Sequence, residues 1–252
     1  MAKQTIGIIP ARYQSTRLPG KPLAEILGKP MIQWVYERAS RAASLEKVIV
    51  ATDDARIERA VKQFGGNVVM TPGDIRSGSD RVAFVARNLD SEIVVNIQGD
   101  EPLIDPTAID IAVSELQDAE DAVVSTLAYA INEPAELENR NTARVVIDTK
   151  GYALYFSRAA IPHMRDSFDR SEWMQHHTYY NHVGLYVFRK EFLLTYTELP
   201  QTPLEQIEKL EQLRILEHGY KIKVGITDSQ PFCVDTPDDL EGVIEEIKRR
   251  AL

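Results

Sequence analysis

The first half of the chain alternates short, continuous apolar runs with segments of helical periodicity, and this alternation restricts the fold. The apolar runs at 5–9, 47–51, 67–70 and 93–97 have the length of strands, and helical patterns follow at 31–43, 55–64, 79–89 and 106–117. Strands that are apolar on both faces are typical of parallel sheets covered by helices on both sides. The pattern therefore predicts an α/β fold with a mostly parallel central sheet flanked by helices.

The second half of the chain is less regular. Strand-like runs at 122–129, 143–147, 153–156 and 182–188 have no long helices between them, so we expect part of the sheet to be antiparallel. A polar, non-periodic stretch at 166–178 predicts a mobile loop. Residues 203–217 and 236–250 read as helices around a strand at 221–226, and the core face of the first helix would hold Leu204, Ile207, Leu210 and Leu213.

Composition and charge exclude several classes of protein. The 252 residues are 44% hydrophobic and 27% charged, which is ordinary for a globular protein, and no internal repeat or linker divides them, so we expect one domain over 1–252. A protruding substructure at about 103–146 is the alternative. The net charge of −9 argues against wrapping nucleic acid. No apolar run approaches the roughly 20 residues of a membrane span, and the first residues lack a signal-peptide pattern, so we expect a cytoplasmic protein without membrane insertion.

The loop that follows the first predicted strand concentrates positive charge. Residues 3–29 contain five cationic residues and one acid. Open α/β sheets bind ligands at the carboxyl ends of their strands, and hydroxyls, main-chain N–H groups and cations together suit a polyphosphate. The alternative is a solvated basic loop, and the spacing matches neither a P-loop nor a dinucleotide fingerprint. The candidate phosphate-binding cations are Arg12, Arg17 and Lys21, which share a turn-rich loop with Ser15, Thr16 and Gly20.

Two acids are candidates for holding a metal ion. Asp100 follows the fourth strand in the sequence QGDEP and should reach the same edge as the cationic loop, so we prefer it over Glu101. Mg²⁺ binds one or two carboxylates together with substrate oxygens. Asp235 is the second candidate, because Thr236 can cap the following helix and leave Asp235 free. The alternatives are a turn acid before Pro102 and a helix-start acid.

Other polar residues give weaker signals. The RSGSDR stretch at 76–81 precedes a helix, where N–H groups can approach a base or phosphate. Arg158 and Arg165 could pair with a substrate carboxylate or form surface salt bridges. Glu211 could point inward near a ligand or be a solvated acid, and for His182, which begins an apolar strand, a structural role is the more common case. The chain has no G-x-S-x-G elbow, and its single cysteine, Cys233, excludes an intrachain disulfide. A reaction driven by positioning and metal electrostatics fits better than a protein nucleophile.

Taken together, these motifs resemble the CMP-Kdo synthetase (3-deoxy-manno-octulosonate cytidylyltransferase) family over nearly the whole chain. The matching stretches, in the family's order, are IIPARYQSTRLPGKPL, VIVATDD, SGSDR, VVNIQGDEPLI, GYALYFSRAAIP, HVGLY, PLEQIEKLEQLR and VDTPDDL. The resemblance implies a Rossmann-like nucleotide-diphospho-sugar transferase fold with a smaller antiparallel dimerisation substructure, and a homodimer. It also implies that CTP and a 3-deoxy-ulosonic acid give a CMP-sugar and pyrophosphate, with Mg²⁺ as cofactor, for lipopolysaccharide biosynthesis.

The resemblance further implies a role for each matching residue. Lys21, Arg17, Asp100 and Asp235 would be catalytic, and the two aspartates would bind Mg²⁺. The nucleotide would be held by Arg12, Ser15, Arg17, Lys21, Arg76, Ser77, Gly78 and Arg81. The sugar would be held by Gln98, Arg158, Arg165, His182, Tyr186, Glu211 and Gln212.

Two stretches depart from the family pattern. Ile75–Arg81 reads IRSGSDR where the family has HQSGTER, so Arg76 replaces an amide near the nucleotide. The stretch 166–180 is also unusual, which suggests a Kdo variant such as an 8-amino Kdo as substrate. The competing hypotheses are a cytidylyltransferase for a sialic-acid-type sugar and a catalytically inactive nucleotide-binding regulator.

Overall fold

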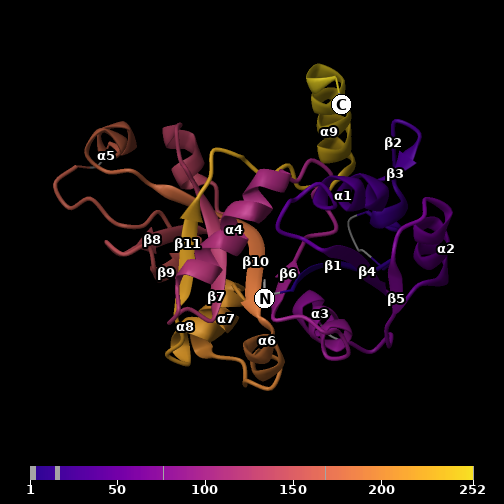
Figure 1. Ribbon diagram of the computed structural model, residues 1–252. Helices are drawn as coiled ribbons and strands as arrows, with labels where there is room; N and C mark the ends of the chain where they lie inside the picture. The colour runs from indigo at the N-terminus through magenta and orange to yellow at the C-terminus, as the bar shows by residue number, and fades with distance from the viewer. Residues whose placement is uncertain (1–3, 15–17, 76, 168, 252) are drawn as a thin grey trace. The chain divides into compact units, whose positions relative to one another are not determined.

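The computed structural model describes residues 4–14, 18–75, 77–167 and 169–251 (Figure 1). Contacts divide the chain into two compact units. The first comprises Met1–Asp110, Val187–Thr197 and Pro231–Leu252, and the second comprises Ile111–Tyr186 and Glu198–Gln230. The prediction of one domain is not tested by this division and stays a prediction. Within the described residues, no helix is both long and apolar enough to span a membrane.

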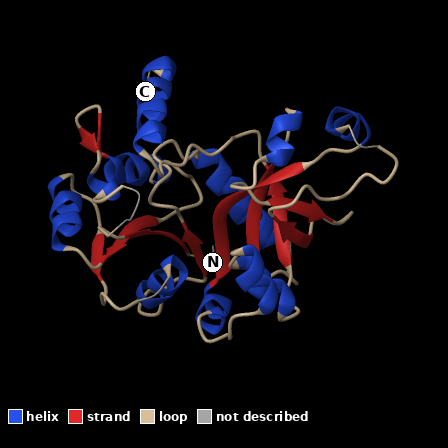
Figure 2. Cartoon of the chain, turned by 180° about the vertical axis from the view of Figure 1, so that it is seen from behind, coloured by secondary structure: helices blue, strands red, loops and turns tan. Residues whose placement is uncertain are grey.

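The first unit is built on four parallel strands in the order β6-β1-β4-β5. Their bounds are β1 (Thr5–Ala11), β4 (Lys47–Thr52), β5 (Val68–Met70) and β6 (Ile93–Asn96), and the connecting helices are α1 (Met31–Ala39), α2 (Ala55–Gln63) and α3 (Gly78–Ala86). Figures 1 and 2 show α1 and α3 on opposite faces of these strands. This confirms the predicted parallel sheet with helices on both sides, although α1 ends four residues before the predicted boundary at 43.

The cationic segment after β1 forms short elements that pack beside the C-terminal helix. After β1 the chain forms η1 (Lys21–Leu23) and a hairpin of β2 (Glu25–Ile26) and β3 (Lys29–Pro30). The C-terminal helix α9 (Pro237–Arg250) packs here. Its Val243 and Ile247 lie in one buried cluster with Trp34 of α1 and with Val234. Burial of this cluster fixes the segment that precedes α9 and therefore the position of Asp235.

The second unit combines parallel and antiparallel pairing. β7 (Val124–Ala130) and β11 (Ile222–Ile226) are parallel, whereas β8 (Arg144–Ile147) pairs antiparallel with β9 (Ala153–Ser157) and β10 (Tyr180–Arg189). The predicted mixed sheet with an antiparallel part is confirmed. The chain also forms α4 (Pro106–Asp118), η2 (Pro134–Glu138), α5 (Arg170–His176), α6 (Lys190–Tyr196), α7 (Pro203–Glu208) and α8 (Gln212–Glu217).

Two predictions about this half of the chain are wrong. The stretch 166–178 is not all loop, because α5 forms there with Asp169 as its N-cap and with Trp173 only 2% exposed. The helix predicted over 203–217 is divided into α7 and α8 at Lys209, which adopts a left-handed conformation with φ of 56°. This break turns the first half of the segment, so Ile207, predicted in the core, is 78% exposed. Leu204 is likewise exposed.

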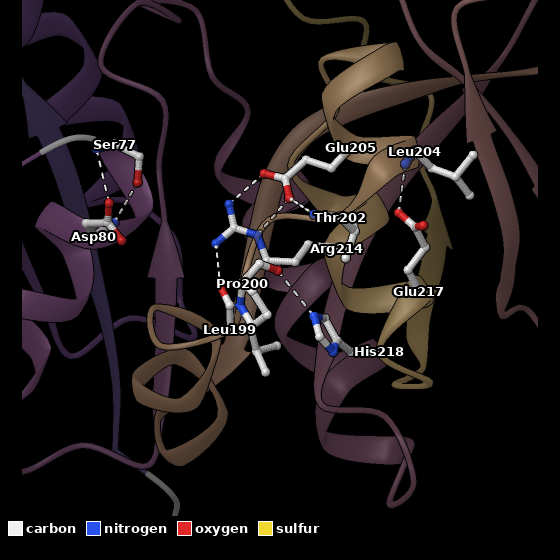
Figure 3. A network of polar contacts seen from close by, with 10 residues as sticks. All are labelled: Ser77, Asp80, Leu199, Pro200, Thr202, Leu204, Glu205, Arg214, Glu217 and His218. Atoms are coloured by element: carbon white, nitrogen blue, oxygen red, sulfur yellow. Dashed lines mark hydrogen bonds and ion pairs between the residues drawn. The ribbon is translucent and has the colours of Figure 1, made fainter.

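A buried ion pair holds the two short helices together (Figure 3). Glu205 of α7 accepts hydrogen bonds from Arg214 of α8 at 2.5 and 2.8 Å, and the two side chains are 5% and 11% exposed. Glu205 also accepts from the main-chain N–H of Thr202 in a capping box. Glu205 is therefore a structural residue.

We predict that Glu205→Gln lowers the free energy of unfolding by about 3 kcal/mol, because the buried Arg214 guanidinium would lose the carboxylate that accepts two of its hydrogen bonds. The matched control is Glu58→Gln, which removes an exposed pair with Lys62 four residues along α2 and should cost less than about 0.5 kcal/mol. Urea denaturation of both variants measures the difference. Equal losses in the two variants would contradict the structural role of Glu205.

Candidate active site

The loop after β1 is tied to the loop before α3. The Arg12 guanidinium donates to the carbonyl of Ile75 and, at 3.3 Å, to that of Ser77. Gly20 closes the loop with φ of 72°, and its N–H donates to the Tyr13 carbonyl at 3.0 Å. A Cβ at this position would lie 3.1 Å from the Tyr13 ring, so glycine is favoured. Ser15, Arg17 and Arg76 lie outside the described residues.

Lys21 is held between the two predicted metal ligands. Its Nζ donates to Asp100 Oδ2 at 2.7 Å and to Asp235 Oδ1 at 3.1 Å, and its side chain is 15% exposed. Burial by itself lowers the pKa of Lys21, but the Asp100 and Asp235 carboxylates raise it and prevail, so the ammonium stays charged. The three residues come from η1, from the turn after β6 and from the start of α9.

The turn after β6 requires a close approach between two main-chain segments. A Cβ at Gly99 would lie 2.9 Å from the carbonyl oxygen of Pro10, so only glycine lets the turn approach β1 here. Asp100 follows directly and faces Lys21. Its neighbour Glu101 is buried, and burial followed by the Asp100 charge raises the pKa of Glu101 to about 8. Glu101 is therefore protonated at neutral pH, which supports the choice of Asp100.

Asp235 is fixed by main-chain contacts on both sides. The N–H of Val234 donates to the Asp100 carbonyl at 2.9 Å, which joins the two acid segments directly. Thr236 accepts from the N–H of Asp239 and forms a capping box for α9. The prediction that Thr236 caps the helix is confirmed, and the Asp235 carboxylate contacts Lys21, whereas its predicted role as a metal ligand stays a prediction.

These residues fit a magnesium ion by their chemistry. Two carboxylates from separate segments converge on one cation, and Mg²⁺ uses such a pair together with phosphate oxygens and water. Among the residues that the structure describes, no cluster of three or more His, Cys, Asp or Glu side chains could hold a metal by itself. The donor set is thus one that a substrate phosphate would complete.

The predicted nucleotide residues near α3 differ in exposure, because Ser77 and Gly78 are half-buried and Arg81 is buried. Ser77 is the N-cap of α3 and forms a capping box with Asp80 (Figure 3), and Gly78 is the first helical residue. Arg81 is fully buried, and its guanidinium donates to Asp53 at 3.1 Å and to the Thr71 hydroxyl. Its contacts therefore join the segments after β4 and β5 beneath this part of the site. Gln98, predicted to hold the sugar, is half-buried in the turn after β6.

The other predicted sugar residues lie in the second unit. Arg158 donates to three main-chain carbonyls, at 3.0 Å to Glu208, 3.1 Å to Arg140 and 2.9 Å to Asn141. The Glu208 carboxylate in turn accepts from the Arg158 N–H at 3.0 Å and from Ser157 at 2.6 Å. Among the described residues, none accepts a hydrogen bond from Nη2 of Arg158.

The remaining sugar candidates differ in exposure. His182 and Tyr186 lie on one face of β10 with ring centroids 5.4 Å apart, and burial lowers the pKa of His182 to about 3. Gln212 is buried, and its Nε2 has no hydrogen-bond partner among the described residues. Glu211 is exposed at the N-cap of α8, and Arg165 is exposed beside Asp166.

The sequence did not indicate the residues that hold the predicted site residues in place. Asp53 pairs with Arg81, Glu208 holds the start of the Arg158 segment, and Thr126 contacts His182 at 2.9 Å. Asp53 alone had a local signal, because it follows a predicted strand at the same sheet edge as Asp100. Thr126 and Glu208 act across 56 and 50 residues, where neither spacing nor periodicity gives information.

Comparisons with known proteins show which proteins this chain is similar to. The chain is 51% identical over 247 residues to 3-deoxy-manno-octulosonate cytidylyltransferase of Geotalea daltonii, covering 96% of this chain and 98% of that protein. It is 52% identical over 240 residues to the protein of the same name from Aliivibrio fischeri, covering 94% and 96%.

A solved structure and a family profile extend the comparison. The structure of CMP:2-keto-3-deoxy-manno-octonic acid synthetase complexed with CTP superposes with a TM-score of 0.91 at 42% identity, covering 98% of this chain and 99% of that one. The sequence profile of the family described as Cytidylyltransferase matches residues 6–222. With the paired carboxylates at the sheet edge and relatives of this similarity over nearly its whole length, the chain belongs to the cytidylyltransferase family.

Proposed function

We propose that this protein is a 3-deoxy-manno-octulosonate cytidylyltransferase, which converts CTP and Kdo, or a close variant such as an 8-amino Kdo, to the CMP-sugar and pyrophosphate for lipopolysaccharide biosynthesis. The observation that carries the proposal is the convergence of Lys21, Asp100 and Asp235 at the carboxyl edge of a parallel sheet. The relatives at about half identity support the choice of sugar. We further propose that the enzyme is a cytoplasmic homodimer, on the family resemblance alone.

In this reaction the anomeric hydroxyl oxygen of the sugar forms a bond to the α-phosphorus of CTP. The bond from that phosphorus to the pyrophosphate oxygen breaks, pyrophosphate leaves, and the hydroxyl proton is released to water. Negative charge increases on the phosphate oxygens, and the charged Lys21 ammonium is suited to stabilise it. Asp100 and Asp235 would hold Mg²⁺, which when bound neutralises charge on the triphosphate.

Arg158 is proposed to bind the sugar carboxylate. Its Nη2 is the guanidinium nitrogen without a partner among the described residues, and a charge-assisted bond to a carboxylate is the contact for which arginine is suited. The carbonyls that hold its other two nitrogens fix the direction of the side chain. An acidic sugar needs such a local cation in a protein with a net charge of −9.

The central experiment crosses nucleoside triphosphates with sugar acids and measures pyrophosphate release. The panel contains CTP, UTP and ATP against Kdo, 8-amino Kdo and a sialic acid, with and without Mg²⁺. Release with CTP and a Kdo-type sugar is expected. Preference for the sialic acid would instead assign a related cytidylyltransferase, and no release with any pair would favour a nucleotide-binding regulator.

We predict that Asp100→Asn lowers kcat at saturating Mg²⁺ by at least about a hundredfold, or about 3 kcal/mol, because a metal carboxylate is lost. Asp235→Asn should behave in the same way. Asp90→Asn is the matched control, since Asp90 is exposed and lies before the opposite end of β6. Near-wild-type turnover of a folded Asp100→Asn protein would contradict the assignment of Asp100 as a metal ligand.

Lys21→Ala is expected to lower kcat strongly while the KM for CTP changes less, because the ammonium acts on charge that builds up in the transition state. Steady-state kinetics with varied CTP separate the two constants. The control is Lys29→Ala, which removes a nearby cation that pairs with Glu37 instead. If Lys21→Ala raises only KM, Lys21 contributes uniform binding and no catalysis.

For Arg158→Lys we expect the KM for the sugar to rise about ten- to hundredfold, as for loss of a charge-assisted contact of roughly 1.5–3 kcal/mol. CTP affinity, measured by calorimetry, should stay nearly unchanged. Thermal unfolding of the same variant reports on the lost carbonyl contacts. Weaker CTP binding with an unchanged sugar KM would move Arg158 to the nucleotide side.

A further inference from the structure

A buried threonine in the second unit contacts three groups at once. Thr126 of β7 is fully buried, and its Oγ1 lies 2.7 Å from the Leu185 carbonyl oxygen, 3.0 Å from that of Val183 and 2.9 Å from His182 Nε2. A hydroxyl has one proton to donate and lone pairs to accept with. The position of that one proton therefore decides the role of the histidine.

The carbonyl contacts fix the direction of the threonine proton. A hydroxyl oxygen and a carbonyl oxygen at 2.7 Å are both electron-rich, so this distance is stable only with a proton between them. The Thr126 proton thus points to the main-chain carbonyls of β10. At the remaining contact, Oγ1 can only accept, and His182 must donate from Nε2.

The surroundings of the His182 ring also determine its charge. The side chain lies in a mostly apolar setting, with the Phe156 ring edge-on at 4.9 Å between centroids, and burial lowers the pKa of His182 to about 3. The imidazole is therefore neutral near pH 7 and carries a single ring proton. If that proton is on Nε2, then Nδ1 has a lone pair and no proton.

Nδ1 has no hydrogen-bond partner among the described residues. His182 as a whole is 9% exposed. The ring also lies beside Tyr186, the other β10 residue predicted to bind the sugar. A lone pair at this place accepts a hydrogen bond from a hydroxyl or an ammonium and offers nothing to a carboxylate.

We propose that Thr126 is a positioning residue that holds His182 as the Nε2–H tautomer, so that Nδ1 accepts a hydrogen bond from a donor group of the sugar. The assignment of the donor to the sugar rests on the proposed function, whereas the tautomer does not. Thr126 does not touch the substrate in this scheme. It acts by excluding the tautomer that would present a proton where the ligand also presents one.

The first test measures the tautomer without any sugar. Long-range ¹H–¹⁵N spectra of ¹⁵N-histidine-labelled protein distinguish protonated from unprotonated ring nitrogens, and the chain has only five histidines. His182→Gln identifies the His182 signals by their loss. We expect a protonated Nε2 and an unprotonated Nδ1 at pH 7. A protonated Nδ1 in the wild-type protein would overturn the proposal, whatever the variants do.

The second test uses a matched pair of variants. Thr126→Val keeps the shape but removes the hydroxyl, and Thr126→Ser keeps the hydroxyl. In the valine variant we expect a mixed tautomer signal and a KM for the sugar that is about five- to tenfold higher, with little change in kcat or in the KM for CTP. The serine variant should restore the wild-type tautomer and bring the sugar KM back to within about twofold.

The outcomes separate this inference from the proposed function. An unchanged tautomer in a folded Thr126→Val protein overturns the role of Thr126, and a shifted tautomer with an unchanged sugar KM overturns the role of Nδ1 in sugar binding. If the wild-type protein releases no pyrophosphate from CTP with Kdo or 8-amino Kdo, the proposed function fails. No KM for the sugar can then be measured, but the spectra still decide whether Thr126 determines the tautomer of His182.

Discussion

The contact of one ammonium with two carboxylates is the constraint on which the first unit depends. Lys21 lies 79 residues from Asp100 and 214 residues from Asp235 along the chain, so only the fold can bring them together. Parallel strands bring the ends of β1 and β6 to one edge, and Gly99 lets the turn after β6 approach β1 within van der Waals distance. The bond from Val234 to the Asp100 carbonyl then places the second carboxylate, and the buried cluster around Trp34 anchors the helix that follows.

Without a cation, the two carboxylates would repel each other at this edge. Lys21 offsets that repulsion and keeps both side chains oriented before any ligand arrives, which is the preorganisation that electrostatic catalysis needs. Glu101, next to them, avoids adding a third negative charge because its burial favours the protonated form. The same sequence stretch therefore provides one charged and one neutral carboxyl group, and the difference between them is set by burial.

The sequence indicated the first unit better than the second, and the reason is physical. Continuous apolar runs and helical periodicity are local signals, so the parallel strands, their helices and the acids after them could be placed by pattern. The break at Lys209 has no such signal, since a left-handed helix C-cap is usually marked by glycine and a lysine stands at this one. Likewise, the α5 helix depends on burial of Trp173, whose indole donates to the Ser167 carbonyl at 2.8 Å, and its polar neighbours mask that role in the sequence.

The two units differ in the partners of their buried arginines. Arg81 in the first unit and Arg144 in the second are both fully buried, but Arg81 pairs with a carboxylate, whereas Arg144 donates to the carbonyls of Glu136, Asn139 and Thr142. Burial lowers the pKa of Arg144, and the nearby Glu138 and Glu136 carboxylates act in the opposite direction. The Arg144 charge is therefore partly balanced by acids of the same unit, although its direct hydrogen bonds go to main-chain carbonyls. Arg158, held by three carbonyls in the same way, extends that arrangement. Burial keeps His182 neutral, and Gln212 is buried as well, so these two predicted sugar residues add polarity to the unit without adding charge.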